Sequence, residues 1–463
     1  MGIIVKYMKI KYLILAISAV AILSCNCKNE PAIIKTEIPE RPAGQQSVIG
    51  LTAEPMQTVR IGVAGLGMRG GFAVQRLTFV PGVQITAICD IEPDRVAESC
   101  KWLVENGHQE PSCFSGAEDS WKGLCERDDV DLVYICTDWL NHAPIALYAM
   151  EQGKHTAIEV PAALNLEEIW ALINTSERTR RHCMMLENCV YDFFELNALA
   201  MAQSGLFGEI VHAEGSYNHN LDPFWDEYWH SWRLEYNKTH RGDVYPTHGI
   251  GPVCQALNIH RGDRMTTLVA MDTDAFNGPR IVESRGEEPC PDFKNGDVTC
   301  SLIRTAKGKT ILIEHDVMTP RPYSRMYQLV GTDGYAAKYP INQFCLRENL
   351  EADANSVGRE KVLTGDAAKE LQDQYRAVIL TPELEDLAKK VGGHGGMDYI
   401  MDYRLVYCLR NGLPLDMDVY DLAEWCCVSE LSRISIENGC APVEVPDFTR
   451  GEWDKVKGFN YAL

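Results

Sequence analysis

The sequence is poor in basic residues and lacks the spacings that bind metals. Its 44 Lys and Arg residues stand against 65 Asp and Glu residues, which gives a formal net charge of -21. This charge, together with the lack of a basic stripe with interleaved aromatic residues, disfavours a nucleic-acid partner. The 17 cysteines form no CxxC pair, and we expect no metal. Most cysteines are predicted to be buried thiols, and the sequence leaves room for one or two disulfides.

Long apolar runs are also missing, apart from one short segment near the N-terminus. Three lysines precede the apolar residues 12–23, a stretch too short for a stable membrane span, which predicts a signal peptide over residues 1–24. Ile22-Leu23-Ser24-Cys25 is similar to a bacterial lipobox. It predicts an exported protein that contacts the membrane only through a lipid on Cys25, with a plain secretory signal as the alternative. Residues 25–57 contain four prolines and no periodicity, and we expect a tether.

A dinucleotide-binding pattern follows this segment. Residues 59–70, VRIGVAGLGMRG, combine an apolar strand with the turn glycines Gly65, Gly67 and Gly70. These glycines serve the tight turn, the approach of backbone to pyrophosphate and close helix packing, respectively. Asp90 ends the next apolar run and can accept both ribose hydroxyls. Because Asp90 would repel a 2'-phosphate, the predicted cofactor is NAD rather than NADP.

An alternation of strands and helices continues beyond this pattern. It runs through a strand at 131–137, a helix opened by Pro144, a strand at 154–158 before Glu159-Val160-Pro161, a helix at 166–180 and a strand at 183–188. We therefore predict a doubly wound parallel α/β sheet, a Rossmann domain, over residues 58–188. Ligands lie beyond the carboxyl ends of such strands, so residues 139–142 are expected near the nicotinamide ribose.

The pattern changes from Gly208 onward. Long β-rich runs are followed by helical segments at 398–410 and 420–437, which predicts an α+β domain with a mostly antiparallel sheet over residues 189–463. The chain is long enough for two domains with substantial cores, since 46% of its residues are apolar. We expect the second domain to hold the substrate, and a homo-oligomer is compatible with the sequence.

Export restricts the chemistry of a protein that uses NAD. Free dinucleotide is scarce outside the cytoplasm, and no reductase system there would regenerate a cofactor consumed at each turnover. A bound cofactor that is restored within every cycle avoids this difficulty. The predicted compartment therefore favours redox-neutral chemistry.

Residues 58–440 resemble the glucose-fructose oxidoreductase and inositol dehydrogenase superfamily. Members usually carry lysine between the Glu and Pro that follow the fifth strand, where this chain has Val160. The chain is instead similar to glycoside hydrolase family 109, which reads EVPAA at this place. Further strings of this kind are Met185-Leu186-Glu187-Asn188, Trp232-Arg233-Leu234, Tyr245-Pro246-Thr247-His248-Gly249 and Gly393-His394-Gly395-Gly396-Met397-Asp398.

The resemblance implies an NAD-dependent α-N-acetylgalactosaminidase. Such an enzyme oxidises C3 of the sugar, eliminates the aglycone from C1, adds water and reduces the ketone again. The net reaction is hydrolysis without change of the cofactor, in agreement with the export argument. NAD-dependent glycosidases are exceptions to the rule of paired carboxylates.

The resemblance also implies the site residues. His248, at the start of a predicted helix, is the expected base, and Tyr245 is its phenolic partner. Arg233 follows an aromatic cluster and can donate to a substrate oxygen. The predicted substrate-binding residues are Tyr217, Arg233, Tyr245, Pro246, Thr247, His248 and Tyr323. Each of these has a structural alternative: a helix cap for His248, a turn aromatic for Tyr245, and a core cluster with one salt bridge for Arg233 and its aromatic neighbours.

The cofactor contacts are inferred in the same way. They are Gly65, Leu66, Gly67, Met68, Arg69, Gly70, Asp90, Trp139, Leu140, Asn141, His142, Glu159, Val160 and Asn188. For Glu159 a backbone-bonded structural role is the alternative. Tyr191 is a further candidate phenol, whereas His394, in a run of four glycines, is not included among the catalytic residues.

Two other functions remain open on the sequence alone. A sugar dehydrogenase would keep the cofactor site and release an oxidised product, but the missing lysine and the export signal argue against it. The second is a non-catalytic sugar-binding lipoprotein. It would not explain why Tyr245 and His248 accompany an intact Rossmann site.

Overall fold

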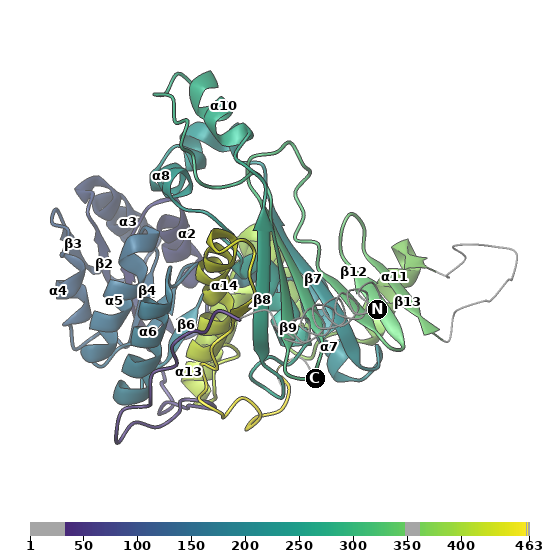
Figure 1. Cartoon of the computed structure of the whole chain (residues 1–463). Coiled ribbons are helices and arrows are strands. Elements are labelled where there is room, and N and C mark those ends of the chain that lie inside the picture. The colour runs from purple at the N-terminus through teal and green to yellow at the C-terminus, as the bar shows by residue number, and fades with distance from the viewer. Residues whose placement is uncertain (1–32, 348–361, 460, 462–463) are drawn as a thin grey trace, which may run out of the picture.

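The computed structural model describes residues 33–347, 362–459 and 461. The predicted signal peptide and Cys25 lie outside the described residues. The first domain is built on a parallel six-stranded sheet with the order β3-β2-β1-β4-β5-β6 (Figure 1). Its strands are β1 (Val59–Ala64), β2 (Val83–Asp90), β3 (Ser112–Ser115), β4 (Leu132–Ile135), β5 (His155–Ile158) and β6 (Cys183–Met185). Its helices are α2 (Met68–Leu77), α3 (Pro93–Glu105), α4 (Trp121–Cys125), α5 (Trp139–Glu151) and α6 (Leu166–Thr179).

This arrangement is the predicted Rossmann fold. The central strands β4 and β5 are buried along their whole length, as expected for a parallel sheet with helices on both faces. Helix α5 differs from the prediction, because it begins at Trp139 and contains Pro144 in its interior. The Asp138 side chain caps it by accepting a hydrogen bond from the Leu140 N–H. This capping carboxylate, and not the proline, determines where the helix begins.

The second domain is built on a nine-stranded sheet, ordered β14-β13-β12-β11-β7-β10-β9-β8-β15. Only β7 and β10 run parallel among its pairs, so the sheet is mostly antiparallel, as predicted. The strands are β7 (Ile210–Asn218), β8 (Met265–Asp272), β9 (Thr299–Thr305), β10 (Thr310–Asp316), β11 (Gln328–Gly331), β12 (Gly334–Ala337), β13 (Gln343–Leu346), β14 (Leu363–Thr364) and β15 (Val443–Glu444). The helices are α7 (Phe193–Gln203), α8 (Trp232–Thr239), α9 (Thr247–Ala256), α10 (Asn277–Ser284), α11 (Gly365–Gln374), α12 (Pro382–Val391), α13 (Met397–Asn411) and α14 (Val419–Glu437).

Helices α13 and α14 lie between the two sheets and join them (Figure 1). Helix α14 packs against α6 of the first domain and against β8 of the second. On the second side the Ala270 N–H donates to Ser435 Oγ at 2.9 Å. Helix α13 packs against α2 and β1. The cofactor domain is therefore held against the second domain by helices that come late in the chain.

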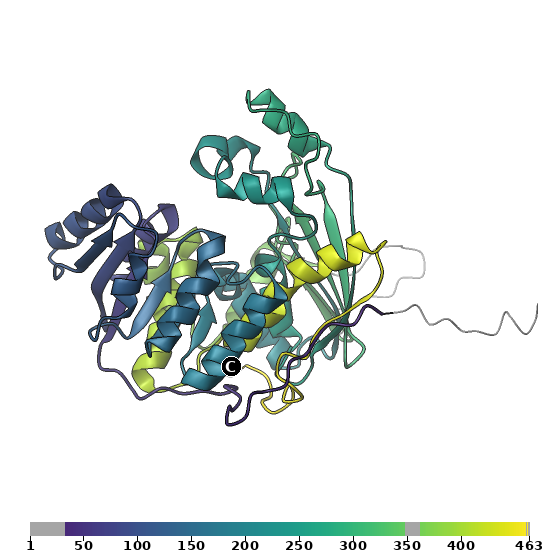
Figure 2. The same ribbon diagram turned by 60° about the vertical axis from the view of Figure 1, so that its left-hand side comes forward.

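The segment before β1 is not a free tether over its described part. Residues 33–57 run along both domains (Figure 2). Val48 is buried, and Arg41 Nε lies 3.2 Å from Glu177 Oε2. Glu177 is itself fully buried, and a buried carboxylate requires paired cations, which Arg41 and Arg450 supply. The tether prediction is therefore wrong for this segment.

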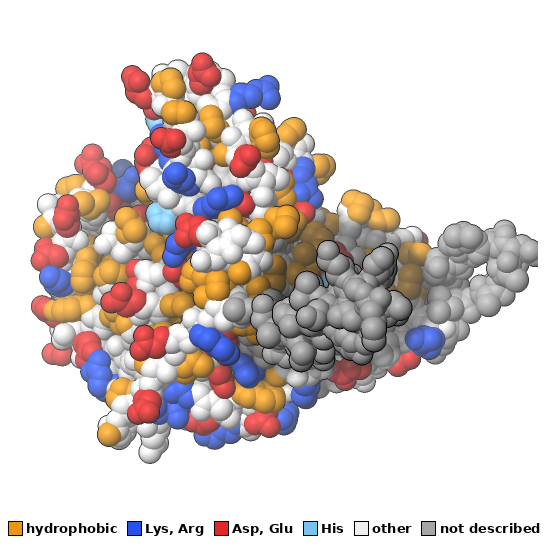
Figure 3. All heavy atoms as spheres, in the orientation of Figure 1, with side chains coloured by type: hydrophobic (Ala, Val, Ile, Leu, Met, Phe, Trp, Pro, Cys, Tyr) orange, Lys and Arg blue, Asp and Glu red, His pale blue; other side chains and the backbone are white. Residues whose placement is uncertain are grey.

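The strand predicted at 183–188 is shorter in the structure. Strand β6 ends at Met185, and a 3₁₀ turn, η1 (Asn188–Tyr191), follows. The Glu187 side chain begins that turn by accepting from the Cys189 N–H at 3.1 Å. Among the described helices, none combines the length and the hydropathy needed to cross a bilayer. On the face shown in Figure 3, acidic and basic side chains are mixed with apolar ones over the described residues.

Candidate active site

The glycine turn between β1 and α2 has room for a dinucleotide. Gly65 has a φ of +88°, and a Cβ at Gly70 would lie 1.7 Å from the Gly65 carbonyl oxygen, so both positions need glycine. A Cβ at Gly67 would meet only Arg95, at 3.8 Å, so the backbone there borders open space. Helix α2 has no side-chain cap, which leaves its first N–H groups for a pyrophosphate. The turn therefore fits NAD.

A cavity of about 760 Å³ opens beside this turn. Among the predicted cofactor contacts it is lined by Gly65, Gly67, Met68, Arg69, Asp90, Leu140 and Asn141. Leu66 and Gly70 lie behind this surface, because Leu66 is buried and Gly70 packs against Gly65. The cavity thus joins the turn to the ends of β2 and β4.

Asp90 braces the glycine turn from the end of β2. Its Oδ2 accepts a hydrogen bond from the Leu66 N–H at 2.6 Å, and its Oδ1 accepts one from the Glu92 N–H at 2.9 Å. Arg95 Nη1 lies 3.5 Å from the same Oδ1. The carboxylate therefore has a structural role in addition to its predicted contact with ribose. Arg95 is a cavity residue that the sequence analysis did not identify.

The first turn of α5 borders the same cavity. Asn141 Nδ2 donates to Asp138 Oδ2 at 2.7 Å, and the Leu140 side chain is exposed. His142 is buried, with Nδ1 2.8 Å from the Pro161 carbonyl oxygen and Nε2 3.0 Å from that of Thr137. Burial lowers the pKa of His142, although its hydrogen bonds to the two carbonyl oxygens act in the opposite direction. This histidine links the ends of β4 and β5.

An ion-pair network connects the cofactor turn to the second domain. Arg69 Nη2 lies 2.7 Å from Glu159 Oε1, and its Nη1 lies 3.0 Å from Asp398 Oδ2. Asn188 Nδ2 donates to Asp398 Oδ1 at 2.5 Å, and His394 Nδ1 lies 3.0 Å from Asp398 Oδ2. Burial alone would raise the pKa of Asp398, but the bond to His394 and the charge of Arg69 hold it far below its usual range. The sequence analysis missed Asp398 and did not include His394 in the site.

A second cavity, of about 930 Å³, adjoins the first and shares Met68, Arg69 and Arg233 with it. Besides Met68 and Arg69, it brings together ten predicted site residues: Trp139, His142, Glu159, Val160, Asn188, Tyr217, Arg233, Tyr245, His248 and Tyr323. These residues come from both domains. The two cavities therefore form adjacent chambers, one at the cofactor turn and one at the predicted substrate residues.

His248 lies in the first turn of α9 and is oriented by a carboxylate. Its Nδ1 lies 2.7 Å from Glu187 Oε1, and its Nε2 lies 3.4 Å from the Tyr245 hydroxyl. Burial would raise the pKa of Glu187, but the charge of a protonated His248 and the hydrogen bond between the two side chains lower it, so Glu187 stays ionised. Once the His248 ring has lost one of its two protons, the ionised acceptor at Nδ1 keeps the other proton on that nitrogen and leaves the lone pair on Nε2. Glu187 is a site residue that the sequence analysis missed.

Tyrosine and histidine side chains of the second domain also line the second cavity. The Tyr217 hydroxyl lies 2.9 Å from His219 Nδ1, and burial lowers the pKa of His219 to about 4. His219 packs edge-to-face against Tyr323, with ring centroids 5.1 Å apart. Burial raises the pKa of Tyr323 to about 12, so its phenol is neutral. His219 is a further residue that the sequence pattern did not reveal.

Arg233 lies in a box of aromatic rings. Its guanidinium carbon is 4.1 Å from the Tyr228 ring centroid and 5.0 Å from those of Trp139 and Tyr245. No salt bridge of Arg233 occurs within the part of the chain that the structure describes. Cation–π contacts of this kind hold a guanidinium without neutralising it. The charge of Arg233 is therefore available to a ligand oxygen in either cavity.

Besides Leu66 and Gly70, three predicted residues lie outside these cavities. Pro246 caps α9 through its carbonyl oxygen, which accepts from the Gly249 and Ile250 N–H groups, and Thr247 is fully buried. Tyr191 is also buried, and its hydroxyl donates to Asp416 Oδ2 at 3.2 Å, away from His248. The idea that Tyr191 is an extra active-site phenol is therefore wrong. Tyr191 is the last residue of η1, the turn that follows the early end of β6.

Two groups of side chains have metal-ligand character. Glu187, Cys189 and His248 place donor atoms within 4.8 Å of one another. Burial raises the pKa of the Cys189 thiol well above its usual range, which keeps it protonated and a poor ligand. The other group, His260, Asp418 and Asp421, lies at a third cavity.

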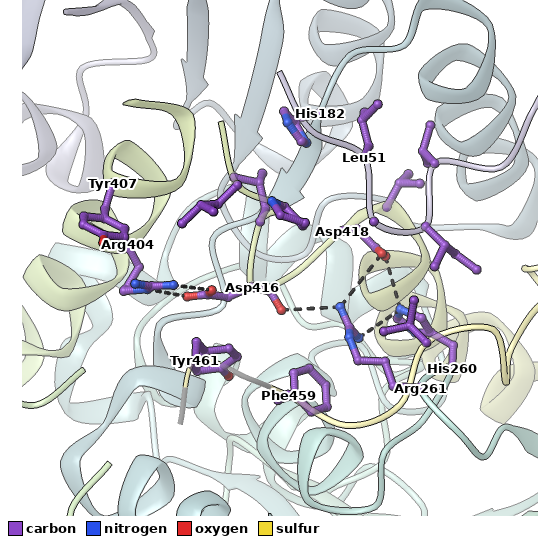
Figure 4. A pocket seen from close by; sticks show the side chains of 18 of the residues that line it. Leu51, His182, His260, Arg261, Arg404, Tyr407, Asp416, Asp418, Phe459 and Tyr461 are labelled. Atoms are coloured by element: carbon purple, nitrogen blue, oxygen red, sulfur yellow. Dashed lines mark hydrogen bonds and ion pairs between the residues drawn. The ribbon is translucent and has the colours of Figure 1, made fainter. Parts of the chain in front are cut away.

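The third cavity, of about 670 Å³, is separate from these two chambers (Figure 4). Its charged groups are already paired: Arg404 Nη2 lies 2.7 Å from Asp416 Oδ1, and Arg261 Nη1 lies 2.8 Å from Asp421 Oδ1. The same Arg261 nitrogen lies 3.0 Å from His260 Nε2, inside the group formed by His260, Asp418 and Asp421. A guanidinium at this place opposes a bound cation.

Comparison with known proteins identifies the family of each domain. Residues 59–187 match the model for the oxidoreductase family with an NAD-binding Rossmann fold, and residues 191–455 match the model for the C-terminal domain of glycosyl hydrolase 109. The fold and the glycine turn define a Rossmann-type, NAD-binding enzyme with a glycosidase domain. The chain belongs to glycosyl hydrolase family 109.

Relatives and solved structures agree with this assignment. A glycosyl hydrolase family 109 protein of Porphyromonas gingivalis is 60% identical over 97% of both chains. Family 109 protein 1 of Bacteroides thetaiotaomicron is 60% identical over 98% of this chain and 99% of its own. A levoglucosan dehydrogenase solved with NADH and levoglucosan has a TM-score of 0.63 at 18% identity, covering 84% of this chain and all of its own. This likeness shows the fold alone.

Proposed function

We propose that this glycosidase releases terminal α-linked N-acetylgalactosamine by oxidation, elimination, hydration and reduction of the sugar. The observation that carries the proposal is the Glu187–His248 pair. This pair leaves the lone pair of His248 Nε2 at the wall of the second cavity, 3.4 Å from the hydroxyl of the neutral Tyr245. A base beside a hydrogen-bond-donating phenol suits proton removal from a sugar hydroxyl and from the neighbouring carbon.

The chain's own residues supply binding and proton transfer. NAD held at the turn of Gly65, Gly67 and Gly70 would supply the hydride chemistry at C3. His248 accepts the proton of the 3-hydroxyl and passes it to solvent, and the ketone at C3 acidifies the proton at C2. His248 then accepts the C2 proton while the aglycone leaves C1 with a proton from solvent. Water adds across the resulting double bond, with hydroxyl at C1 and hydrogen at C2. Burial raises the pKa of Tyr245 well above its usual range, so the phenol stays protonated and can donate a hydrogen bond to a substrate oxygen.

Arg233 and the aromatic rings around it suit the acetamide group and the faces of the sugar. The guanidinium is charged and free of carboxylate partners among the described residues. It can donate to the acetamide oxygen, while Tyr217 and Tyr323 line the same cavity. The ion pairs that Asp398 makes with Arg69 and His394 hold the cofactor turn in a fixed position relative to this cavity.

One assay tests the proposal against its alternatives. Purified protein is incubated with an aryl α-N-acetylgalactosaminide and no added cofactor. Release of the phenol without a rise in the absorbance of NADH is the expected result. A stoichiometric rise in NADH would support a sugar dehydrogenase instead. No reaction, with the sugar still bound, would support a non-catalytic binding protein.

We also propose that the protein is exported and attached to the membrane through a lipid on Cys25. The proposal rests on the lipobox-like residues 22–25, and it agrees with a cofactor that is conserved in each cycle. Cys25→Ser should abolish incorporation of labelled fatty acid and release the protein from the membrane fraction. Retention of both in the variant would contradict the anchor.

A further inference from the structure

Helix α2 is apolar on the face that packs into the core and on the face that points outward. Ala73, Val74 and Leu77 are buried beneath it. On the outer side Met68 and Phe72 are exposed, and so is Phe79, two residues beyond the end of the helix at Leu77. Phe72 is 63% exposed and Phe79 is 54% exposed. A row of exposed large apolar side chains on one helix suggests a binding surface.

This outer row belongs to the substrate cavity. Met68, Phe72 and Phe79 line the same cavity as His248 and Tyr323, and Trp102 of α3 lies in its wall. The surface formed by Phe72, Phe79 and Trp102 is called the α2 platform below. It continues the cavity beyond the residues that would hold the reacting sugar.

A polar side chain lies between the aromatic ones. Gln75 lines the cavity, and its amide makes no hydrogen bond with any residue that the structure describes. Arg76, the other polar residue here, is occupied by Asp402, with Nε 2.7 Å from Oδ2. Aromatic faces beside a free amide match the apolar faces and hydroxyl edges of sugar rings.

We propose that the α2 platform is the subsite for the leaving-group side of the substrate, and that it binds the sugar units that precede the terminal residue in an oligosaccharide. The inference rests on the proposed glycosidase activity. Phe72 lies in α2, Phe79 lies two residues beyond its end, and Trp102 comes from α3, so the platform draws on two elements. A surface of three aromatic side chains suits more than one sugar ring. The platform thereby selects glycans over simple aryl glycosides.

A second copy of the chain is the competing occupant of this face. A permanent protein partner on Phe72 would cover part of the cavity that His248 also lines. An oligosaccharide covers the platform only while it is bound. The shared cavity therefore favours the glycan.

The test compares two substrates in matched variants. Phe72→Ala and Phe79→Ala remove platform rings, while Phe276→Ala removes a ring that is 70% exposed and lies outside the cavity. Each protein is assayed with the aryl α-N-acetylgalactosaminide and with a tetrasaccharide ending in α-linked N-acetylgalactosamine. Platform variants should raise KM for the tetrasaccharide about threefold to tenfold each and leave kinetics on the aryl glycoside unchanged. Phe276→Ala should change neither.

Calorimetric binding of the tetrasaccharide separates failure of the subsite from failure of the proposed activity. Weaker binding in Phe72→Ala than in the natural protein supports the platform even if no hydrolysis is detected. Equal tetrasaccharide binding and KM in the natural and doubly substituted proteins would overturn it. Loss of a dimer in Phe72→Ala with unchanged tetrasaccharide KM would assign the face to a second copy instead.

Discussion

His248 Nδ1 lies 2.7 Å from Glu187 Oε1, although the two residues belong to different domains of the fold. Glu187 follows the last strand of the parallel sheet, and His248 lies in the first turn of α9. The contact therefore depends on how the two domains pack. It fixes the ring so that Nε2 faces the cavity.

Replacing Glu187 with Gln should disturb His248 without emptying the cofactor site. The amide can donate to Nδ1 as well as accept from it, so the imidazole loses its fixed tautomer. We expect kcat to fall by about tenfold to a hundredfold, because general-base catalysis needs the lone pair on Nε2. Nitrogen NMR of labelled histidine measures the tautomer directly, and NAD content should be unchanged.

Glu424→Gln is the matched control for this substitution. Glu424 is equally buried, and burial raises its pKa well above the usual range, so it is already neutral. Its amide variant should retain activity and the histidine signal. An unaltered tautomer in Glu187→Gln would show that Glu187 does not position His248.

Asp90→Ala should reduce the amount of NAD that co-purifies and lower activity with it. The substitution removes the acceptor of the Leu66 N–H bond, 2.6 Å long, as well as the predicted ribose bonds. Hydrogen bonds to charged groups are worth about 1.5 to 3 kcal/mol each. Asp90→Asn keeps an acceptor for Leu66 and should lose less. Equal NAD retention in all three proteins, measured after precipitation, would remove Asp90 from the cofactor site.

Asp243 predicts a particular dependence of stability on pH. Burial raises its pKa to about 7, while the Tyr245 N–H donates to Oδ1 at 3.1 Å. A carboxyl with a raised pKa in the folded state stays protonated between about pH 4 and 7, whereas the unfolded chain loses that proton. Its contribution therefore makes the free energy of unfolding fall across this window and level off above it.

Asp243→Asn should remove this dependence. Asn keeps an acceptor for Tyr245 and carries no charge to bury. The shift from 3.8 to about 7 corresponds to about 4 kcal/mol at most, so the variant should be more stable than the natural protein above pH 7. Urea unfolding between pH 4.5 and 8.5 measures the difference. Parallel curves for both proteins would mean that Asp243 is ionised throughout.

The parts of the fold that local sequence determines were predictable. The Rossmann turn can be predicted because its three glycines are required by local geometry, at positions close together in the sequence. They are Gly65, Gly67 and Gly70. The period of apolar residues likewise predicted α13 and α14 to within two residues at each end. These signals do not depend on distant parts of the chain.

Contacts between distant segments were not predictable. Glu187 lies 61 positions before His248, and Asp398 lies 329 positions after Arg69. Neither pair has a spacing that the sequence could reveal. The packing of residues 33–57 was missed for the same reason, because their buried partners, such as Glu177, come much later. The predicted residues of the cavity wall were found through family resemblance, and their roles remain predictions.

His248→Gln should keep the fold and bound NAD while lowering turnover by about a hundredfold or more, the range typical of lost general acid-base catalysis. The same mechanism requires the C2 proton to leave the sugar. Hydrolysis by the natural protein in deuterated water should therefore place deuterium at C2 of the released N-acetylgalactosamine, which NMR of the product detects. Direct displacement at C1 would leave C2 protonated. Product without deuterium at C2, together with a normal rate in the glutamine variant, would rule out both the elimination route and the role of His248, because each rests on proton removal by the Nε2 atom that Glu187 holds toward the cavity.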